Sequence, residues 1–75
     1  MRYPKASREE LQAPTGKFRI IGVDLKGGTT ANYHLGDFET LELAEKLAKE
    51  KASVGKPIYI YDDNSELVVR YGSWH

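Results

Sequence analysis

The sequence contains no cysteine, one methionine, one tryptophan and three prolines among 75 residues. Without cysteine, disulfide scaffolds, thiolate nucleophiles and thiolate metal sites are excluded, so histidine and carboxylate side chains are the metal ligands that remain. No stretch approaches the roughly 20 apolar residues of a membrane-crossing helix, and residues 1–5 lack the apolar run of a secretory signal. We therefore expect a soluble, cytoplasmic protein that requires no cofactor and binds no membrane.

An excess of charge of either sign is also missing, because eleven basic and eleven acidic side chains cancel. A neutral chain generates no overall field that would draw it to nucleic acid or to an acidic membrane. The length allows one small domain, since a second core would leave each half too short to bury enough surface. We expect an irregular or partly helical lead over residues 1–16, a domain over 17–72 and a short tail over 73–75.

Two pairs of segments rich in β-branched and aromatic residues predict two β-hairpins. Lys17–Leu25 and Thr29–Leu35 flank Gly27-Gly28, which supplies the positive φ angles of a tight turn. Ile58–Tyr61 and Glu66–Tyr71 flank a run of Asp, Asn and Ser, the residue types that favour turns because their side chains bond to their own backbone.

A helix is predicted between the two hairpins, from about Leu41 to Val54. Thr40 is a preferred N-cap residue, Gly55 stands where a left-handed C-cap belongs, and Pro57 prevents continuation. The element order is then β-β-α-β-β. We predict an α+β fold, with a four-stranded, mainly antiparallel sheet and one helix packed on one face.

The turns fix which residues face each other, and directly opposed residues point to the same side of a sheet. The predicted pairs are Ile20–Leu35, Ile21–His34, Gly22–Tyr33, Val23–Asn32, Ile58–Tyr71, Tyr59–Arg70, Ile60–Val69, Tyr61–Val68 and Asp62–Leu67. The helix is expected to cover the face that holds Phe18, Ile20, Tyr33, Leu35, Ile58, Ile60, Leu67 and Val69. One helix covers one face, so the second face is expected to be open.

The open face is more apolar and aromatic than a solvated sheet face needs to be, which marks it as a candidate interaction surface. The predicted surface consists of Ile21, Val23, His34, Tyr59, Tyr61, Val68 and Arg70. Three explanations for it are open. In the first explanation, the face is covered by the chain itself: either the lead, which contains Tyr3, Leu11 and Pro14, or the tail, which contains Trp74, folds over it.

Alternatively, two copies bury the face between them as a homodimer, because a small domain gains stability from a shared core. In the third explanation a single-stranded nucleic acid stacks on Tyr59 and Tyr61, the mode of sheet-surface RNA readers. Its phosphates would then lie near Lys17, Arg19, His34 and Arg70. The absence of net positive charge disfavours this third explanation.

Catalytic and metal sites are not predicted. His34 could form an acid–base or metal-binding pair with Asp62 or Asp63, but nothing in the sequence brings these residues together. Asp62 and Asp63 are the residue types that a tight turn requires. The run 62–66 lacks the glycine and the distant glutamate of a calcium loop, and Gly27-Gly28 leads into a strand, whereas a phosphate cradle leads into a helix. We therefore interpret the protein as a non-enzymatic interaction module that binds a second copy or another protein, with single-stranded nucleic-acid binding as the alternative.

The stretches 36–48 and 58–68 resemble small bacterial ββαββ families of uncharacterised function. The shared features are a Phe-x-Thr-x-x-x-Ala helix start, matched by Phe38, Thr40 and Ala44, and an aliphatic strand that ends in an acidic turn. Asn64-Ser65 departs from the Asp/Asn-Gly usual at such a turn. A similar helix start follows the strands of DNA-binding sheet domains in phage-type integrases, but those domains are markedly basic. The resemblance implies the fold and no activity.

Overall fold

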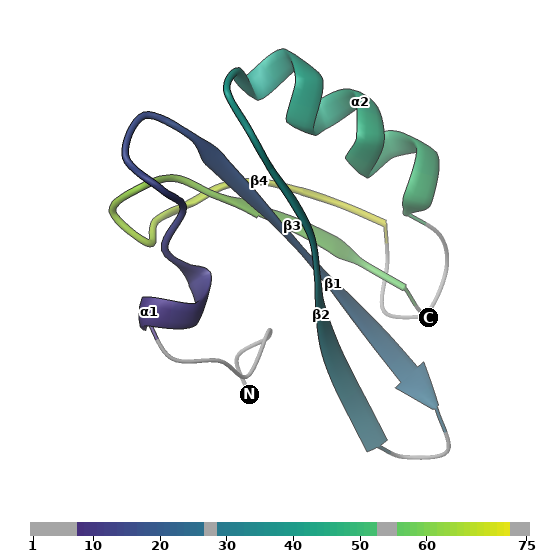
Figure 1. Ribbon diagram of the computed structural model, residues 1–75. Coiled ribbons are helices and arrows are strands. Elements are labelled where there is room, and N and C mark those ends of the chain that lie inside the picture. Colours follow the sequence, from purple (N-terminus) through teal and green to yellow (C-terminus); the bar gives the residue numbers. More distant parts are fainter. Residues whose placement is uncertain (1–7, 27–28, 53–55, 73–75) are drawn as a thin grey trace.

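The computed structural model describes residues 8–26, 29–52 and 56–72. Its elements are α1 (Arg8–Leu11), β1 (Phe18–Lys26), β2 (Thr29–Phe38), α2 (Leu41–Lys51), β3 (Ile58–Tyr61) and β4 (Leu67–Tyr71). The four strands form one antiparallel sheet in the order β2-β1-β3-β4 (Figure 1). The predicted α+β class and the β-β-α-β-β order are confirmed. The predicted turn at Gly27-Gly28, the cap at Gly55 and the tail over 73–75 lie outside the described residues.

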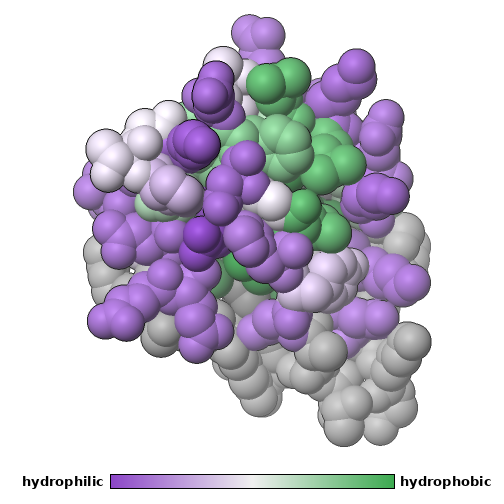
Figure 2. Space-filling view, in the orientation of Figure 1, coloured by the Kyte–Doolittle hydropathy of each residue, from purple (hydrophilic) through white to green (hydrophobic). Residues whose placement is uncertain are grey.

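Helix α2 begins where the sequence places it. The Thr40 backbone is extended, and its hydroxyl oxygen accepts a hydrogen bond from the Leu43 N–H at 3.2 Å, which satisfies one of the donors that a helix start leaves unpaired. The helix ends at Lys51, three residues before the predicted end. Ala44 and Ala48 are buried against the sheet, whereas Leu43 is 52% exposed. Figure 2 shows an apolar area over α2.

The core under α2 consists of three fully buried isoleucines, Ile20, Ile58 and Ile60, together with the two helix alanines. Alanine allows the helix to lie close to the sheet. Two residues predicted for this core are more exposed, Tyr33 at 37% and Leu67 at 51%. The Tyr33 ring lies over Gly22, where an added Cβ would come within 2.5 Å of it. Leu67 is displaced by a β-bulge.

Bulges change three of the predicted pairs, which are Ile20–Leu35, Tyr61–Val68 and Asp62–Leu67. Ile20 pairs with Gly36 and not with Leu35, although the predicted pairs from Ile21 to Val23 form. In the second hairpin the predicted pairs from Ile58 to Ile60 form, but Tyr61 pairs with Leu67 and not with Val68.

The cause of the second bulge lies in the turn. The Asp62 carboxylate accepts hydrogen bonds from the N–H groups of Asn64 at 2.8 Å and Glu66 at 2.9 Å, and the Asp62 N–H donates to the Glu66 carbonyl at 3.0 Å. Asp62 therefore faces Glu66 instead of Leu67. Since Tyr61 faces Leu67 and Ile60 faces Val69, Val68 is left as the extra residue.

The second face of the sheet is not open, which corrects the central expectation from the sequence. Ile21, Val23, Tyr59 and Tyr61 form a second buried cluster, and Leu11 of α1 packs against it. Helices α1 and α2 lie on opposite sides of the sheet (Figure 1). This arrangement agrees with the first of the three explanations, in which the chain itself covers the face, because residues 8–16 of the lead fold back over the strands.

Hydrogen bonds hold the lead to the turn between β3 and β4. The Ala13 N–H donates to the Asp62 carbonyl at 3.1 Å, and the Gln12 side chain donates to the Asp63 carbonyl at 2.8 Å. The Gly16 N–H donates to the Asp63 carboxylate at 2.9 Å. The acidic residues that the sequence assigns to a turn therefore also fasten the lead.

Candidate interaction site

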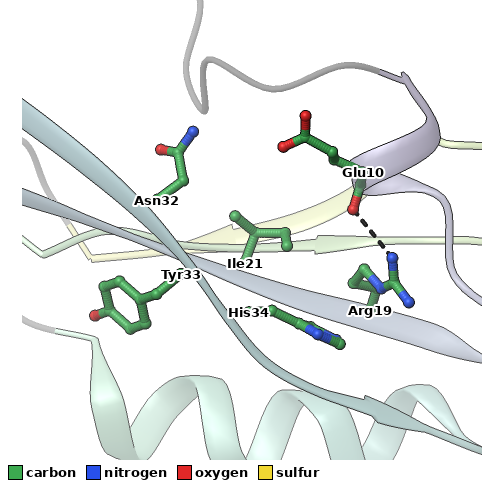
Figure 3. Close-up of a pocket in the computed structure, with 6 residues that line it drawn as sticks. All are labelled: Glu10, Arg19, Ile21, Asn32, Tyr33 and His34. Carbon is green, nitrogen blue, oxygen red and sulfur yellow. Dashed lines mark hydrogen bonds between the residues drawn. The ribbon is translucent and has the colours of Figure 1, made fainter.

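A hollow of about 310 Å³ remains where α1 does not reach β2 (Figure 3). Its lining residues come from three elements: Glu10 of α1, Arg19 and Ile21 of β1, and Asn32, Tyr33 and His34 of β2. Figure 3 shows the Tyr33 ring directed away from Glu10 and Arg19, toward the side of the sheet that carries α2. Ile21 and His34, a cross-strand pair on the second face of the sheet, place the hollow on that face.

Arg19 links the three elements around the hollow. Its guanidinium donates two hydrogen bonds to the Asp37 carboxylate, at 2.8 and 3.1 Å, and a third to the Glu10 carbonyl oxygen at 3.1 Å. A two-point contact of this kind favours the charged forms of both partners, so it raises the pKa of Arg19 and lowers the pKa of Asp37. Asp37 is ionised at neutral pH and largely neutralises Arg19.

His34 is held by the same carboxylate. Its Nε2 atom lies 3.0 Å from Oδ1 of Asp37, and its side chain is 45% exposed. Because an ionised carboxylate only accepts, Nε2 of His34 carries the proton and donates. Asp62 and Asp63, the other acids considered for His34 in the sequence, bond to the lead and the turn instead.

The hollow offers hydrogen-bond donors and acceptors around an apolar floor at Ile21. No serine, threonine, cysteine or lysine side chain is among its lining residues. Within residues 8–26, 29–52 and 56–72, no three histidine, aspartate or glutamate side chains gather as a metal site. This arrangement suits the binding of one side chain of a partner.

The hollow adjoins one edge of the sheet, because β2 is an outer strand that pairs only with β1 among the described strands. Its run from Thr29 to His34 is regular and lies before the bulge. Asn32, Tyr33 and His34 are all exposed. The strand contains neither lysine nor proline, the residues that commonly protect edges.

The direction of the backbone groups on β2 follows from one hydrogen bond. The Val23 N–H donates to the Pro57 carbonyl at 3.0 Å, so Val23 directs its backbone polar groups toward β3. Val23 pairs with Asn32, which in an antiparallel ladder makes theirs a non-hydrogen-bonded pair. Asn32 therefore directs its N–H and C=O away from β1, and so do Thr30 and His34 by alternation.

The structure divides the predicted interaction surface into three groups. Val23, Tyr59 and Tyr61 are buried in the second cluster. Ile21 and His34 line the hollow, and Val68 and Arg70 lie on β4 at the opposite edge. No local sequence pattern points to Glu10 as a site residue, because its place at the hollow requires the lead to fold back. Asp37 stands at a predicted break between elements, and nothing marked it as a partner of Arg19.

The two tyrosines proposed as stacking platforms are not accessible. Tyr59 is 4% exposed and Tyr61 is 7% exposed, and their rings stack on each other with centroids 6.4 Å apart. Burial raises the pKa of Tyr61 to about 12. A nucleic-acid base therefore has no exposed face of either ring on which to stack.

Comparison of the chain with known proteins found no matching family model, no matching curated protein and no matching solved structure. The resemblance to bacterial ββαββ families stays a prediction. Neither described helix has the length and apolar character needed to cross a bilayer.

Proposed function

We propose that the protein is a non-enzymatic interaction module that binds an extended polypeptide segment along the outer edge of β2. The added segment becomes a fifth strand and forms main-chain hydrogen bonds with Thr30, Asn32 and His34. One observation carries the proposal: a regular outer strand without lysine or proline runs directly beside a hollow. Strand addition combines main-chain hydrogen bonds, which give affinity, with pockets for alternate side chains, which give specificity.

The hollow gives this edge a means of selection. In an antiparallel pair, a partner residue opposite Asn32 or His34 points to the same face as they do. Its side chain would enter the hollow, where Ile21 contacts an apolar stem and Arg19 and His34 contact a polar end. Because Asp37 already neutralises Arg19, selection rests on hydrogen bonding more than on net charge.

The experiment is selection of extended peptides on the immobilised protein, followed by hydrogen exchange on the complex. We expect a selected peptide to slow exchange of the Thr30, Asn32 and His34 amides, while the amides of β4 keep their rates. Protection confined to α2 or β4, or no selectable peptide, would contradict the proposal.

Two proline variants provide a matched pair. Asn32→Pro removes an outward N–H from β2, a position at which an edge strand tolerates proline, and is expected to abolish peptide binding. Ile21, like Val23, directs its backbone polar groups toward β3, so its partner Tyr59 directs its own toward β1. Arg70, which pairs with Tyr59, therefore directs its N–H outward. Arg70→Pro makes the same kind of change on β4 and is expected to retain binding. Amide spectra of both variants establish that the fold persists. Equal loss in both variants would contradict the assignment to β2.

A further inference from the structure

Residues 8–16 of the lead contact two separate parts of the domain. At one end Glu10 lines the hollow beside β2, and its carbonyl oxygen accepts a hydrogen bond from Arg19 at 3.1 Å (Figure 3). At the other end, hydrogen bonds from residues 12–16 fasten the lead to the β3–β4 turn. None of the turn residues 62–66 lines the hollow. The lead therefore connects the turn with the hollow.

Helix α1 depends on these contacts for its position. Its four residues are too few to form a helix that is stable by itself. Leu11 packs against the buried cluster of the second face, but the fastening at the turn is polar, and Gln12 and Gly16 are exposed. A segment held mainly by exposed hydrogen bonds opens at a lower free-energy cost than the rest of a domain. We expect residues 8–16 to undock while the sheet and α2 stay folded.

Docking of the lead changes what the hollow offers to a ligand. A side chain that enters the hollow can contact Glu10 only while the lead is docked, because undocking removes this wall. Undocking also breaks the bond from Arg19 to the Glu10 carbonyl. A ligand with more contacts in one of two states shifts the population toward that state, and the effect is reciprocal.

We infer that docking of the lead is coupled to peptide binding at β2, so that the β3–β4 turn regulates the peptide site through the lead. The inference rests on the proposed function, since the ligand is the side chain that a bound peptide places in the hollow. A bound peptide holds the lead down. Conversely, a change that loosens the bonds at the turn weakens peptide binding as far as it increases the undocked fraction.

The test is hydrogen exchange of the whole chain, with and without a saturating amount of a peptide selected at β2. The Ala13 N–H reports docking, because it donates to the Asp62 carbonyl and lies outside the hollow. We expect the peptide to slow its exchange about tenfold. The Ala52 N–H, which donates to the Ala48 carbonyl at the end of α2, should keep its rate. The same peptide with alanine at the position that enters the hollow should still protect β2 but slow Ala13 less.

Variants of the lead and the turn provide the reciprocal measurement. Leu11→Asp would bury a carboxylate beside the tyrosine cluster, so it is expected to undock the lead and weaken peptide binding about tenfold, the same factor. The double variant Gln12→Ala, Asp63→Ala removes two bonds at the turn and is expected to speed Ala13 exchange in the free chain about threefold or more. Amide spectra of α2 and β4 establish that both variants are folded.

Glu66→Gln is the matched control, because Glu66 bonds within the same turn through its backbone and its side chain is exposed. It is expected to change neither Ala13 exchange nor peptide affinity. A peptide that protects the β2 amides without slowing Ala13 overturns the inference and leaves the proposed function standing. Full peptide affinity in Leu11→Asp, or unchanged Ala13 exchange in the double variant, also overturns it. If no peptide protects β2, the proposed function fails and the inference with it.

Discussion

The two faces of the sheet are both buried, but by different means. On one face an eleven-residue helix packs two alanines onto three isoleucines, and the contact is almost wholly apolar. On the other face a four-residue helix contributes Leu11, and hydrogen bonds from residues 12–16 to the β3–β4 turn hold the lead in place. The comparison indicates that the first face supplies most of the stability, whereas the second depends on polar tethers and leaves the hollow beside β2.

The largest effect is expected from the apolar face. Ile60→Ala removes a fully buried side chain beneath α2 and leaves a cavity, so we expect the free energy of unfolding to fall by about 3 kcal/mol. Urea denaturation measures it. Leu43→Ala, on the exposed side of the same helix, is expected to change stability by less than about 0.5 kcal/mol. Similar losses in both variants would contradict the dominance of the buried contact.

On the second face, Leu11→Ala removes the side chain that packs against the tyrosine cluster. Leu11 is half-buried, so the expected loss is smaller, about 1–2 kcal/mol. Tyr61 becomes more hydrated, and its pKa is expected to fall from about 12 toward the ordinary value of 10. The difference between alkaline absorbance titrations with and without Tyr61→Phe measures that pKa.

The sign of the pH dependence follows from the same group. Since the folded chain holds the Tyr61 proton to a higher pH than the unfolded chain does, stability is expected to decline as the pH rises from about 10 to about 12. Leu11→Ala should reduce that decline. An unchanged Tyr61 titration in this variant would show that Leu11 does not shield the cluster.

The turn to which the lead is fastened can be tested at Asp62. Its carboxylate accepts from the Asn64 and Glu66 N–H groups, and its carbonyl accepts from Ala13. Asp62→Ala leaves two turn amides without their acceptor, and we expect a loss of about 1 kcal/mol in thermal unfolding. Asp62→Asn retains an acceptor oxygen and should lose less. Equal losses in the two variants would mean that charge, and not hydrogen bonding, stabilises the turn.

The sequence predicted the element order because each signal for it is local: a capping threonine, β-rich runs and turn residues. In the first hairpin the predicted pairs on the turn side of Ile20 were also correct, whereas in the second hairpin the predicted pairs from Ile58 to Ile60 were correct and the two nearest the turn were wrong. The bulges at Leu35 and Val68 were missed because they depend on how the turn residues bond in three dimensions. Asp62 illustrates this, because its carboxylate accepts a hydrogen bond from the Glu66 N–H, so that Glu66 faces Asp62 and Leu67 faces Tyr61.

The candidate site was predicted less well, for a different physical reason. The alternation of apolar residues correctly identified Ile21, Val23, Tyr59 and Tyr61 as a second apolar face, but alternation does not specify what covers a face. Leu11 is a single apolar residue in a polar lead, and its hydrogen-bonded anchors lie about fifty residues away along the chain. The hollow exists only because of that long-range contact.

The smallest expected effect concerns the ion pair beside the hollow. Hydrogen bonds from Arg19, and then from His34, lower the pKa of Asp37, so the folded state favours its ionised form. The resulting stabilisation is present above the ordinary pKa of 3.8 and is lost as the pH falls through the lower folded value. We expect roughly 0.5–1 kcal/mol between wild type and Asp37→Asn at pH 7, because exposed pairs are weakened by solvent. The difference should shrink below about pH 4. If it persists at pH 2, the contribution of Asp37 is not that of an ionised carboxylate, and Arg19 holds α1 through the Glu10 carbonyl without its help.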